Sequence, residues 1–220
     1  GLFVETNGGA DVVVQFGTNP LDPTDDVDQD SDNDGLLDAI EKVLGPDPLD
    51  GDSDGDGLSD FEELKDLDPN ARDAGDTDPL DADSDDDGLS DGDEVFGTGP
   101  LTPVGATSPL KFDTDGDGLG DGLERGVTAG IPAGSSDGPA SVTTGGTDPA
   151  VFKADSDGAS VTDPTEPDTD KDGLSDGAED ANGDGSFVGQ VGGTGTAGSG
   201  ETDPNNPDSD SDGLTDGNEV

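Results

Sequence analysis

One twelve-residue pattern constrains this chain more than any other feature. The pattern D-x-D-x-D-G-L-x-D-x-x-E occurs six times without a mismatch, and a repeat of this kind sets the architecture. Its copies use 24 of the 47 aspartates and 6 of the 10 glutamates, whereas a merely solvated charge run has no fixed positions. Because like charges at this spacing repel one another, the pattern requires a positive counter-charge. We number the copies as loops 1 to 6: 30–41, 52–63, 83–94, 113–124, 168–179 and 208–219.

The spacing is that of an EF-hand calcium loop. In such a loop, positions 1, 3 and 5 supply carboxylate oxygens, and position 7 supplies a backbone carbonyl. Position 9 contributes directly or through water, a glutamate at position 12 binds through both oxygens, and glycine at position 6 permits the sharp turn. Calcium is favoured over magnesium, because magnesium demands strict octahedral geometry and keeps several of its waters.

Each loop therefore predicts one calcium site, so that the chain binds at least six calcium ions. The expected ligands at positions 1, 3, 5, 7, 9 and 12 are Asp30, Asp32, Asp34, Leu36, Asp38 and Glu41; Asp52, Asp54, Asp56, Leu58, Asp60 and Glu63; Asp83, Asp85, Asp87, Leu89, Asp91 and Glu94; Asp113, Asp115, Asp117, Leu119, Asp121 and Glu124; Asp168, Asp170, Asp172, Leu174, Asp176 and Glu179; Asp208, Asp210, Asp212, Leu214, Asp216 and Glu219.

The composition indicates that the chain cannot fold without such ions. Its formal net charge is −50 and only 25% of its 220 residues are hydrophobic, values typical of disordered chains. The absence of Cys and His excludes thiolate and imidazole metal sites and most catalytic chemistry, and we expect no enzyme. The negative charge repels nucleic acid, and no apolar run is long enough for membrane insertion.

The loops and their linkers together resemble a known family. With the linkers "NPLDPTDD", "PDPLDGD", "TDPLDAD" and "TDPNNPD", residues 19–220 look like thrombospondin type 3 repeats, especially the bacterial form. This resemblance implies tandem calcium loops with hardly any hydrophobic core, in extracellular stalks, spacers and adhesins. It also implies a secreted or cell-surface protein of a prokaryote. Unlike the animal members, this chain has no cysteines to brace such an architecture.

We expect a mostly irregular, elongated chain of calcium-stabilised loops with short helical turns and no large core. Residues 1–18 contain two β-rich runs around Asn7-Gly8 and predict an N-terminal β-hairpin. This hairpin either caps the first loop or pairs with a neighbouring subunit or domain. Residues 19–125 hold four loops, residues 126–147 form a Gly/Ser/Thr-rich excursion, and residues 148–220 hold the remaining repeats.

Short helices are expected where the loops end. Apolar residues at helical spacing predict an exiting helix after each of the first two loops, and the two helices could bury a miniature core. Glycine at position 10 limits the later helices to one turn. The apolar residues are Leu36, Leu37, Ile40, Val43 and Leu44 after loop 1 and Leu58, Phe61, Leu64 and Leu67 after loop 2; the glycines are Gly92, Gly122, Gly177 and Gly217.

Further acidic residues lie outside the perfect copies. The stretch 155–166 is a degenerate loop, read either as a partial or shared site or as no site. The stretch 180–201 is either a loop interrupted by a Gly-rich insertion and closed by Glu201, or a flexible linker. The additional candidate ligands are Asp155, Asp157, Asp163 and Glu166; Asp180, Asn182, Asp184 and Glu201; and Asp28, Asp50 and Asp81, which precede three loops by two residues.

Three functions fit a chain of this kind. The first is a calcium-rigidified extracellular rod, stalk or fibre subunit, which regular loops and short linkers favour. The second is an adhesin or ligand-binding module with a cell-surface partner, and the third is a calcium reservoir or mineral-nucleating protein. The segment opens with "GL" and closes with "NEV", one residue past a loop. It is therefore expected to be a window on a longer chain or a unit that assembles head to tail with copies of itself.

Removing calcium should abolish the ordered structure, because metal takes the place of a core and folding is coupled to binding. Addition of excess EDTA should convert the circular dichroism spectrum to that of a disordered chain. A spectrum unchanged by EDTA would contradict this reading of the loops.

Overall fold

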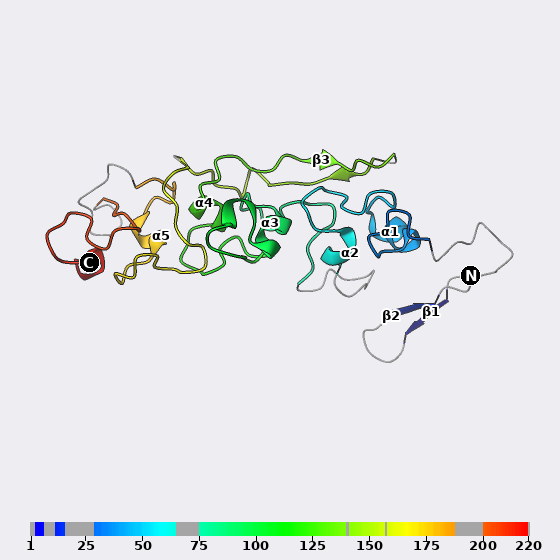
Figure 1. The fold of residues 1–220 in the computed structure, drawn as a ribbon, viewed down its shortest axis with the longest axis horizontal. Helices are drawn as coiled ribbons and strands as arrows, with labels where there is room; N and C mark the ends of the chain where they lie inside the picture. The colour runs from blue at the N-terminus through cyan, green and yellow to red at the C-terminus, as the bar shows by residue number, and fades with distance from the viewer. Residues whose placement is uncertain are drawn as a thin grey trace. The chain divides into compact units, whose positions relative to one another are not determined.

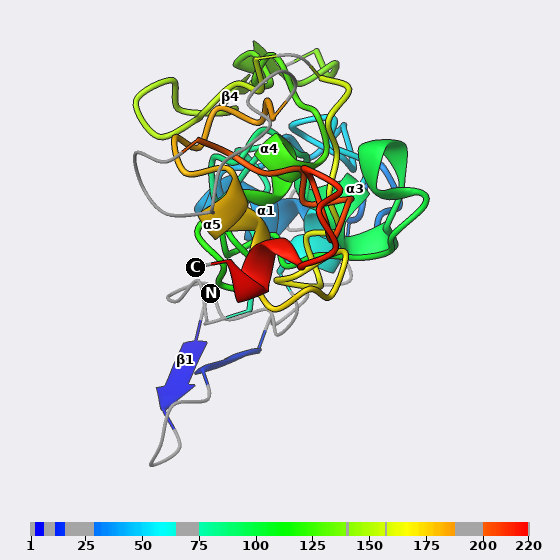
Figure 2. The same ribbon diagram turned by 90° about the vertical axis from the view of Figure 1, so that its left-hand side faces the viewer.

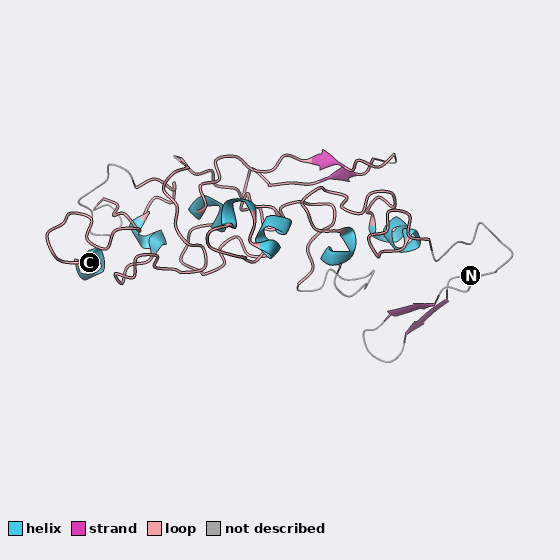
Figure 3. Cartoon of the chain, viewed as in Figure 1, coloured by secondary structure: helices cyan, strands magenta, loops and turns pink. Residues whose placement is uncertain are grey.

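The computed structural model describes residues 3–6, 12–15, 29–64, 75–139, 141–156, 158–187 and 200–219, and only the backbone of the first two ranges. The chain divides into two compact units. The first contains Gly1–Ala82 and Ala133–Gly145 and includes loops 1 and 2; the second contains Asp83–Pro132 and Gly146–Val220 and includes loops 3 to 6. Most of the described chain is loop and turn, with short helices between, as the sequence predicted (Figure 3).

A helix begins at position 9 of every loop. The residue at position 8 is extended and serves as the N-cap, and the aspartate that follows favours the positive end of the helix dipole. One further 3₁₀ turn, η1, covers Gly99–Leu101. The helices, labelled in part in Figure 1, are α1 (Asp38–Leu44), α2 (Asp60–Glu63), α3 (Asp91–Phe96), α4 (Asp121–Glu124), α5 (Asp176–Glu179) and the 3₁₀ helix η2 (Asp216–Asn218).

Two expectations about these helices need correction. Helix α3 has six residues, about 1.7 turns, although Gly92 was expected to limit it to one. It extends because the Ser90 hydroxyl accepts the N–H of Asp93, and because Gly97 closes its C-terminus in the left-handed conformation. The expected miniature core also fails in part, since the side chain of Val43 is 73% exposed. Leu67 lies outside the described residues.

The interior is built from the leucines at position 7. In loops 1 to 4 these side chains are at most 4% exposed, whereas Leu214 in loop 6 is 54% exposed. The position whose carbonyl was predicted to bind calcium therefore also supplies the apolar contact of its loop. The buried apolar side chains among the described residues are Leu36, Leu58, Leu64, Ala82, Leu89, Leu101, Leu119, Leu123 and Phe187.

The described chain contains two antiparallel strand pairs. Near the N-terminus, β1 (Phe3–Thr6) pairs with β2 (Val12–Gln15). The side chains of residues 1–28 lie outside the described part, so the two roles expected of this hairpin, a cap or an assembly edge, stay predictions. The sequence placed the hairpin only there. The hairpin of the acid-rich region lies instead at 134–144, where β3 (Gly134–Ser135) pairs with β4 (Thr143–Thr144), as Figures 1 and 2 show.

This second hairpin is held by the linkers of the first unit. The Ser136 hydroxyl donates to Asp47 Oδ2 at 2.8 Å, and the Asp137 N–H donates to Asp50 Oδ2 at 2.5 Å. The Gly145 N–H donates to the carbonyl oxygen of Leu80 at 2.5 Å. The contacts of this hairpin are to carboxylates and backbone groups, and its strands contain serine, threonine and small residues. Apolar periodicity therefore gave no signal of it.

Consecutive loops within a unit share one repeated contact. The N–H at position 10 of one loop donates to Oδ2 of the position-5 aspartate in the preceding loop. In loops 4, 5 and 6 position 10 is glycine, and a Cβ there would overlap or crowd the carbonyl oxygen of that same aspartate. These glycines therefore permit close packing rather than merely weaken a helix. The donor and acceptor pairs are Phe61 and Asp34, Gly122 and Asp87, Gly177 and Asp117, and Gly217 and Asp172.

Replacing Gly122 by alanine should destabilise the calcium-bound chain. Glycine to alanine in a helix ordinarily stabilises by about 1 kcal/mol, but overpacking costs about 1–3 kcal/mol, so Gly122→Ala should lower the melting temperature measured by circular dichroism. Gly75→Ala is the matched control, because a Cβ there meets no described heavy atom within 4 Å. Equal melting temperatures for the two variants would show that loops 3 and 4 do not pack this closely.

Candidate metal centre

The first half of each loop is held by turns of aspartate side chains around the backbone. In loop 4, Asp113 Oδ2 accepts the Gly118 N–H at 2.9 Å and Asp115 Oδ1 accepts the Asp117 N–H at 3.2 Å. Asp117 Oδ1 in turn accepts the Leu119 N–H at 2.9 Å. Gly118 has φ of +109°, a conformation that favours glycine. The spacing of the pattern thus folds the loop locally and leaves Asp115 Oδ2 without a hydrogen-bond partner among the described residues.

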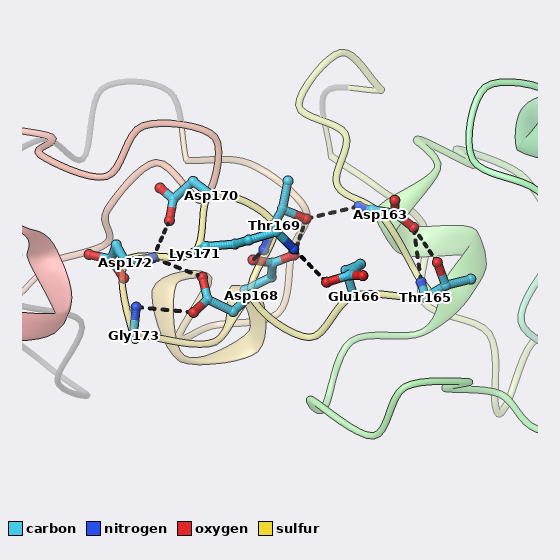
Figure 4. Close-up of polar contacts among 10 residues, drawn as sticks. Asp163, Thr165, Glu166, Asp168, Thr169, Asp170, Lys171, Asp172 and Gly173 are labelled. Carbon is cyan, nitrogen blue, oxygen red and sulfur yellow. Dashed lines mark hydrogen bonds and ion pairs between the residues drawn. The ribbon is translucent and has the colours of Figure 1, made fainter.

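Loop 5 repeats this geometry, as Figure 4 shows. Asp168 Oδ2 accepts the Gly173 N–H at 3.0 Å, and Asp170 Oδ1 accepts the Asp172 N–H at 3.1 Å. Lys171 stands at position 4 with φ of +65°, the left-handed conformation also found at position 4 of the other loops. The position is therefore constrained by backbone rather than by side-chain chemistry, which is why asparagine, glycine, aspartate, lysine and serine all occur there.

The carboxylates at positions 1, 3 and 5 converge. In each of loops 1 to 4, one oxygen from each of the three aspartates lies within 4.8 Å of the other two. Two oxygens that ligate one calcium at 2.3–2.6 Å are at most about 5 Å apart, so the three oxygens can share one ion. The sets are Asp30, Asp32 and Asp34; Asp52, Asp54 and Asp56; Asp83, Asp85 and Asp87; Asp113, Asp115 and Asp117.

The closing glutamate at position 12 is buried and half-satisfied. Glu63, Glu94 and Glu124 are 1%, 0% and 2% exposed, and Oε2 of each has no hydrogen-bond partner among the described residues. The Oε1 atoms of these three glutamates and of Glu179 accept hydrogen bonds from threonine hydroxyls. Those threonines are Thr77 for Glu63 (3.1 Å), Thr107 for Glu94 (2.9 Å), Thr162 for Glu124 (2.8 Å) and Thr202 for Glu179 (2.8 Å).

These threonines are functional residues that the sequence reading missed. Each begins a Thr-Asp-Pro or Thr-Ser-Pro triplet six residues before the next loop, which is the signal that could have found them. Glu41 of loop 1 is followed by Gly45-Pro46 instead, and both of its carboxylate oxygens lack a hydrogen-bond partner in the described chain. The threonine hydroxyl therefore orients the closing glutamate where the triplet is present.

Unpartnered oxygens recur at position 3 as well as at position 12. An ionised carboxylate buried without a partner costs several kcal/mol, so buried charges in proteins are paired or bind metal. An all-oxygen cage with several carboxylates is the donor set that a hard cation such as Ca²⁺ prefers. The position-3 atoms, counted among the described residues and each without a hydrogen-bond partner there, are Oδ2 of Asp32, Asp85, Asp115 and Asp170.

The electrostatics of the loops point the same way. Burial, together with repulsion from the aspartates at positions 3 and 5 of the same loop, raises the pKa of Glu63, Glu94 and Glu124 to about 10. Burial and then repulsion likewise raise the pKa of Glu41 and Asp85 to about 8. The metal-free loops therefore hold these groups protonated at neutral pH.

Protonation in the fold has a defined cost. A carboxyl group whose pKa is raised in the fold contributes its full stabilisation below its pKa in the unfolded chain, about 4.5 for glutamate. This stabilisation is lost as the pH rises toward the pKa of the group in the fold. At pH 7 each of the three glutamates then opposes metal-free folding by on the order of 3 kcal/mol. Three such terms match the whole stability of an ordinary domain, about 5–15 kcal/mol. A bound cation removes this penalty because it stabilises the ionised carboxylates.

The aspartate at position 9 has a contact within its own loop. In loop 2, Asp60 accepts the Ser53 N–H at 2.9 Å through Oδ1 and the Ser53 hydroxyl at 2.8 Å through Oδ2. The hydrogen bond from the backbone N–H at position 2 to the carboxylate at position 9 recurs in all six loops. Position 9 was predicted to ligate the ion of its own loop, and this stays a prediction; the structure shows that the same aspartate closes that loop around position 2.

The interrupted loop at 180–201 has the same geometry as the perfect copies. Asp180 Oδ2 accepts the Gly185 N–H at 2.8 Å, and Asp184 Oδ1 accepts the Ser186 N–H at 3.0 Å. The Asn182 side-chain amide donates to Glu201 Oε1 at 2.5 Å. Glu201 is 4% exposed, and its Oε2 has no hydrogen-bond partner among the described residues. The structure thus brings Glu201 beside Asn182, which stands at position 3 of the interrupted loop.

The degenerate stretch 155–166 does not form one loop. Asp155 lies against the interrupted loop, where a Cβ on Gly185 would come 2.7 Å from its carboxyl carbon. Asp163 accepts the Thr165 N–H in an Asp-Pro turn, and the exposed Glu166 forms an ion pair with Lys171 Nζ at 2.5 Å (Figure 4). Asp163 and Glu166 therefore contact the segment of loop 5.

The remaining candidate ligands lie in the linkers. Asp50 accepts the N–H of Asp137, and Asp81 forms a backbone bridge with Gly145, so both hold the second hairpin. Asp157 and Asp28 lie outside the described residues. The aspartates of the Asp-Pro pairs accept the N–H two residues on, which makes them turn formers: Asp47, Asp78, Asp148, Asp163 and Asp203.

Comparison with known proteins agrees with this geometry. The model of the bacterial TSP3 repeat matches residues 30–51, 52–66, 83–99, 113–125 and 168–183, and no enzyme family matched. Neither a search of curated proteins nor a search of solved structures gave a match. Among the described helices, none has the length and apolar character needed to cross a membrane.

Replacing Thr162 by valine should weaken calcium binding to loop 4. Valine keeps the shape but removes the hydrogen bond that orients Glu124, a loss of about 1 kcal/mol or roughly fivefold in affinity. Isothermal titration calorimetry measures the change, with the exposed Thr143→Val as control. An affinity equal to that of the control would show that the threonine does not position the glutamate.

Proposed function

Because the chain carries bacterial TSP3 repeats at five positions, we propose that it is a non-enzymatic, calcium-rigidified structural segment of a secreted or cell-surface bacterial protein. Its task is that of a rod, stalk or fibre subunit. Calcium is its resident ion, with at least six sites in the perfect loops and a further one at 180–201. The residues that would hold each ion are those of positions 1, 3, 5, 7 and 12.

One observation carries this proposal. The closing glutamates of loops 1 to 5 are buried next to the aspartates of their loops, with oxygens that no described group bonds. Removing these glutamates from water is unfavourable unless a cation joins them. Their place in the interior of each loop makes ion binding and folding one event.

The energetics suit an extracellular setting. Extracellular calcium modules have dissociation constants of about 10⁻⁴–10⁻³ M. At about 1 mM calcium, a site of 10⁻⁴ M contributes about 1.4 kcal/mol, and six sites contribute roughly 8 kcal/mol. This is comparable with the stability of an ordinary domain, about 5–15 kcal/mol. Such loops hold their structure in millimolar calcium and lose it where calcium is scarce.

The contacts between loops favour a mechanical role over a reservoir. A reservoir needs no order between its sites, whereas here the position-10 N–H of one loop is bonded to the position-5 aspartate of the preceding loop in four pairs. Turns at the Asp-Pro pairs shorten the linkers between loops. Ions that order each loop therefore also order its neighbour.

Neighbouring glutamates provide a matched test of the ion sites. Glu63 is buried at position 12, whereas Glu62 is exposed one residue earlier. In about 1 mM calcium, Glu63→Gln should lower the number of bound ions by one in equilibrium dialysis, with an affinity loss at that loop of at least about tenfold, because ligand charge sets calcium affinity. Glu62→Gln should retain every ion. Equal ion counts for both variants would contradict the assignment.

Small-angle X-ray scattering tests the structural role on the same proteins. The calcium-bound chain should scatter as a stiff particle and the chain in EDTA as a flexible coil. If the calcium-saturated chain still scattered as a flexible coil, the result would contradict the structural role and favour the reservoir function.

A further inference from the structure

A second acidic cluster joins two consecutive loops of the second unit. One oxygen each from Asp87 and Glu94 of loop 3 and Asp121 of loop 4 lies within 4.8 Å of the others. The three residues are 1%, 0% and 0% exposed. Asp121 is placed there by the next residue, because the Gly122 N–H donates to Asp87 Oδ2 at 2.9 Å.

Two oxygens of this cluster lack any other use. Glu94 Oε2 and Asp121 Oδ2 have no hydrogen-bond partner among the described residues. In loop 5 the corresponding oxygen of Asp176 accepts a hydrogen bond from the Thr169 hydroxyl at 2.6 Å. In loop 4 the Thr114 hydroxyl oxygen accepts the Ser108 N–H at 3.0 Å, as the Thr169 hydroxyl oxygen accepts the Asp163 N–H at 3.1 Å in loop 5. Three carboxylates this close cannot all ionise in a buried place without a cation.

We propose that Asp121 is a ligand of the cation held by the preceding loop, so that one calcium ion is bound by Asp87, Glu94 and Asp121 together. This inference rests on the proposed function, since it assumes that loop 3 binds calcium. It adds that the site is incomplete until loop 4 has folded. The aspartate at position 9 then has two roles, closing its own loop through Oδ1 and completing the shell of the preceding loop through Oδ2.

The first unit places position 9 of loop 2 in a similar way, although Asp60 Oδ2 also accepts the Ser53 hydroxyl at 2.8 Å. The Phe61 N–H donates to Asp34 Oδ2 at 2.9 Å, which places the adjacent Asp60 toward loop 1. Both oxygens of Glu41 lack a hydrogen-bond partner in the described chain. Repulsion from Asp60, together with that from the aspartates of loop 1, acts on Glu41. Position 9 of the following loop thus stands near positions 5 and 12 of the preceding one in both units.

The consequence is coupling between neighbouring sites. An ion in loop 3 is bound tightly only when loop 4 supplies Asp121, and filling loop 3 in turn holds the first turn of α4 in place. By linkage, each site then raises the affinity of the other by the same factor. Calcium binding should therefore be cooperative along the loops of a unit.

Asp121→Asn tests the shared ligand. Asparagine keeps an oxygen for the Thr114 N–H, which Asp121 Oδ1 accepts at 2.8 Å, and replaces the unpartnered charged oxygen by a neutral amide. The Gly88 and Gly118 N–H groups donate to position 1 of loops 3 and 4, so their NMR signals report on each loop separately. In a calcium titration, Asp121→Asn should raise the midpoint for Gly88 at least about tenfold, because ligand charge sets calcium affinity. A shift of Gly118 alone would overturn the proposal.

Asp38→Asn is the matched control, because Asp38 closes loop 1 in the same way and residues 1–29 contain no copy of the pattern. It should shift the signal of Gly35 in loop 1 directly and that of Gly57 in loop 2 by a smaller amount, through the coupling alone; an equal shift of both would show a nonspecific effect and overturn the proposal. If Asp121→Asn prevents loop 4 from folding, Asp60→Asn decides. Its Gly35 midpoint rises about tenfold if the ligand is shared and stays unchanged if not.

Failure of the proposed function gives a different result. In that case the Gly88 and Gly118 signals of the unsubstituted chain do not respond to calcium chloride at all. A response in the unsubstituted chain with an unchanged Gly88 midpoint in Asp121→Asn overturns only the shared ligand.

Discussion

The structure depends on carboxylate oxygens that are buried and left without hydrogen bonds. In most proteins an apolar core offsets the entropy of ordering the chain, but here the buried apolar side chains among the described residues are few, and four of the nine are the position-7 leucines of loops 1 to 4. The interior of each loop is instead lined by aspartate and glutamate oxygens. Such an interior is unfavourable by itself and becomes favourable when a hard cation is added. Cation binding is therefore needed to complete the fold of each loop.

Neutral groups hold these charged cages in position. Backbone N–H groups fix one oxygen of each aspartate, a threonine hydroxyl fixes one oxygen of the closing glutamate, and glycine at position 10 lets the next loop approach closely. At positions 3 and 12 these contacts use one carboxylate oxygen and leave the other without a hydrogen-bond partner among the described residues, whereas at position 5 both oxygens accept an N–H. The linkers add turns at Asp-Pro pairs, and the hairpin at 134–144 binds the linkers of the first unit.

The sequence predicted the parts of the site that follow from local spacing. The convergence of positions 1, 3 and 5 follows from three alternating aspartates before a glycine, and the place of Glu201 beside Asn182 agrees with one of the two interpretations that the sequence left open for 180–201. It did not predict contacts that join distant residues through single polar atoms. The threonine that bonds Glu124 lies 38 residues away, and Ser136 lies 89 residues from Asp47. Hydrophobic periodicity carries no signal for such contacts. The sequence also does not distinguish a glycine at position 10 that weakens a helix from one that permits close packing.

The central claim is that cations occupy the carboxylate cages of the ordered chain. Anomalous diffraction from crystals grown in calcium tests it most directly, because it locates each ion independently of the surrounding oxygens. The account predicts a calcium peak in each of the six loops, about 2.3–2.6 Å from the oxygens of the closing glutamate. Well-ordered loops without such peaks, their glutamate oxygens bonded to water alone, would contradict it.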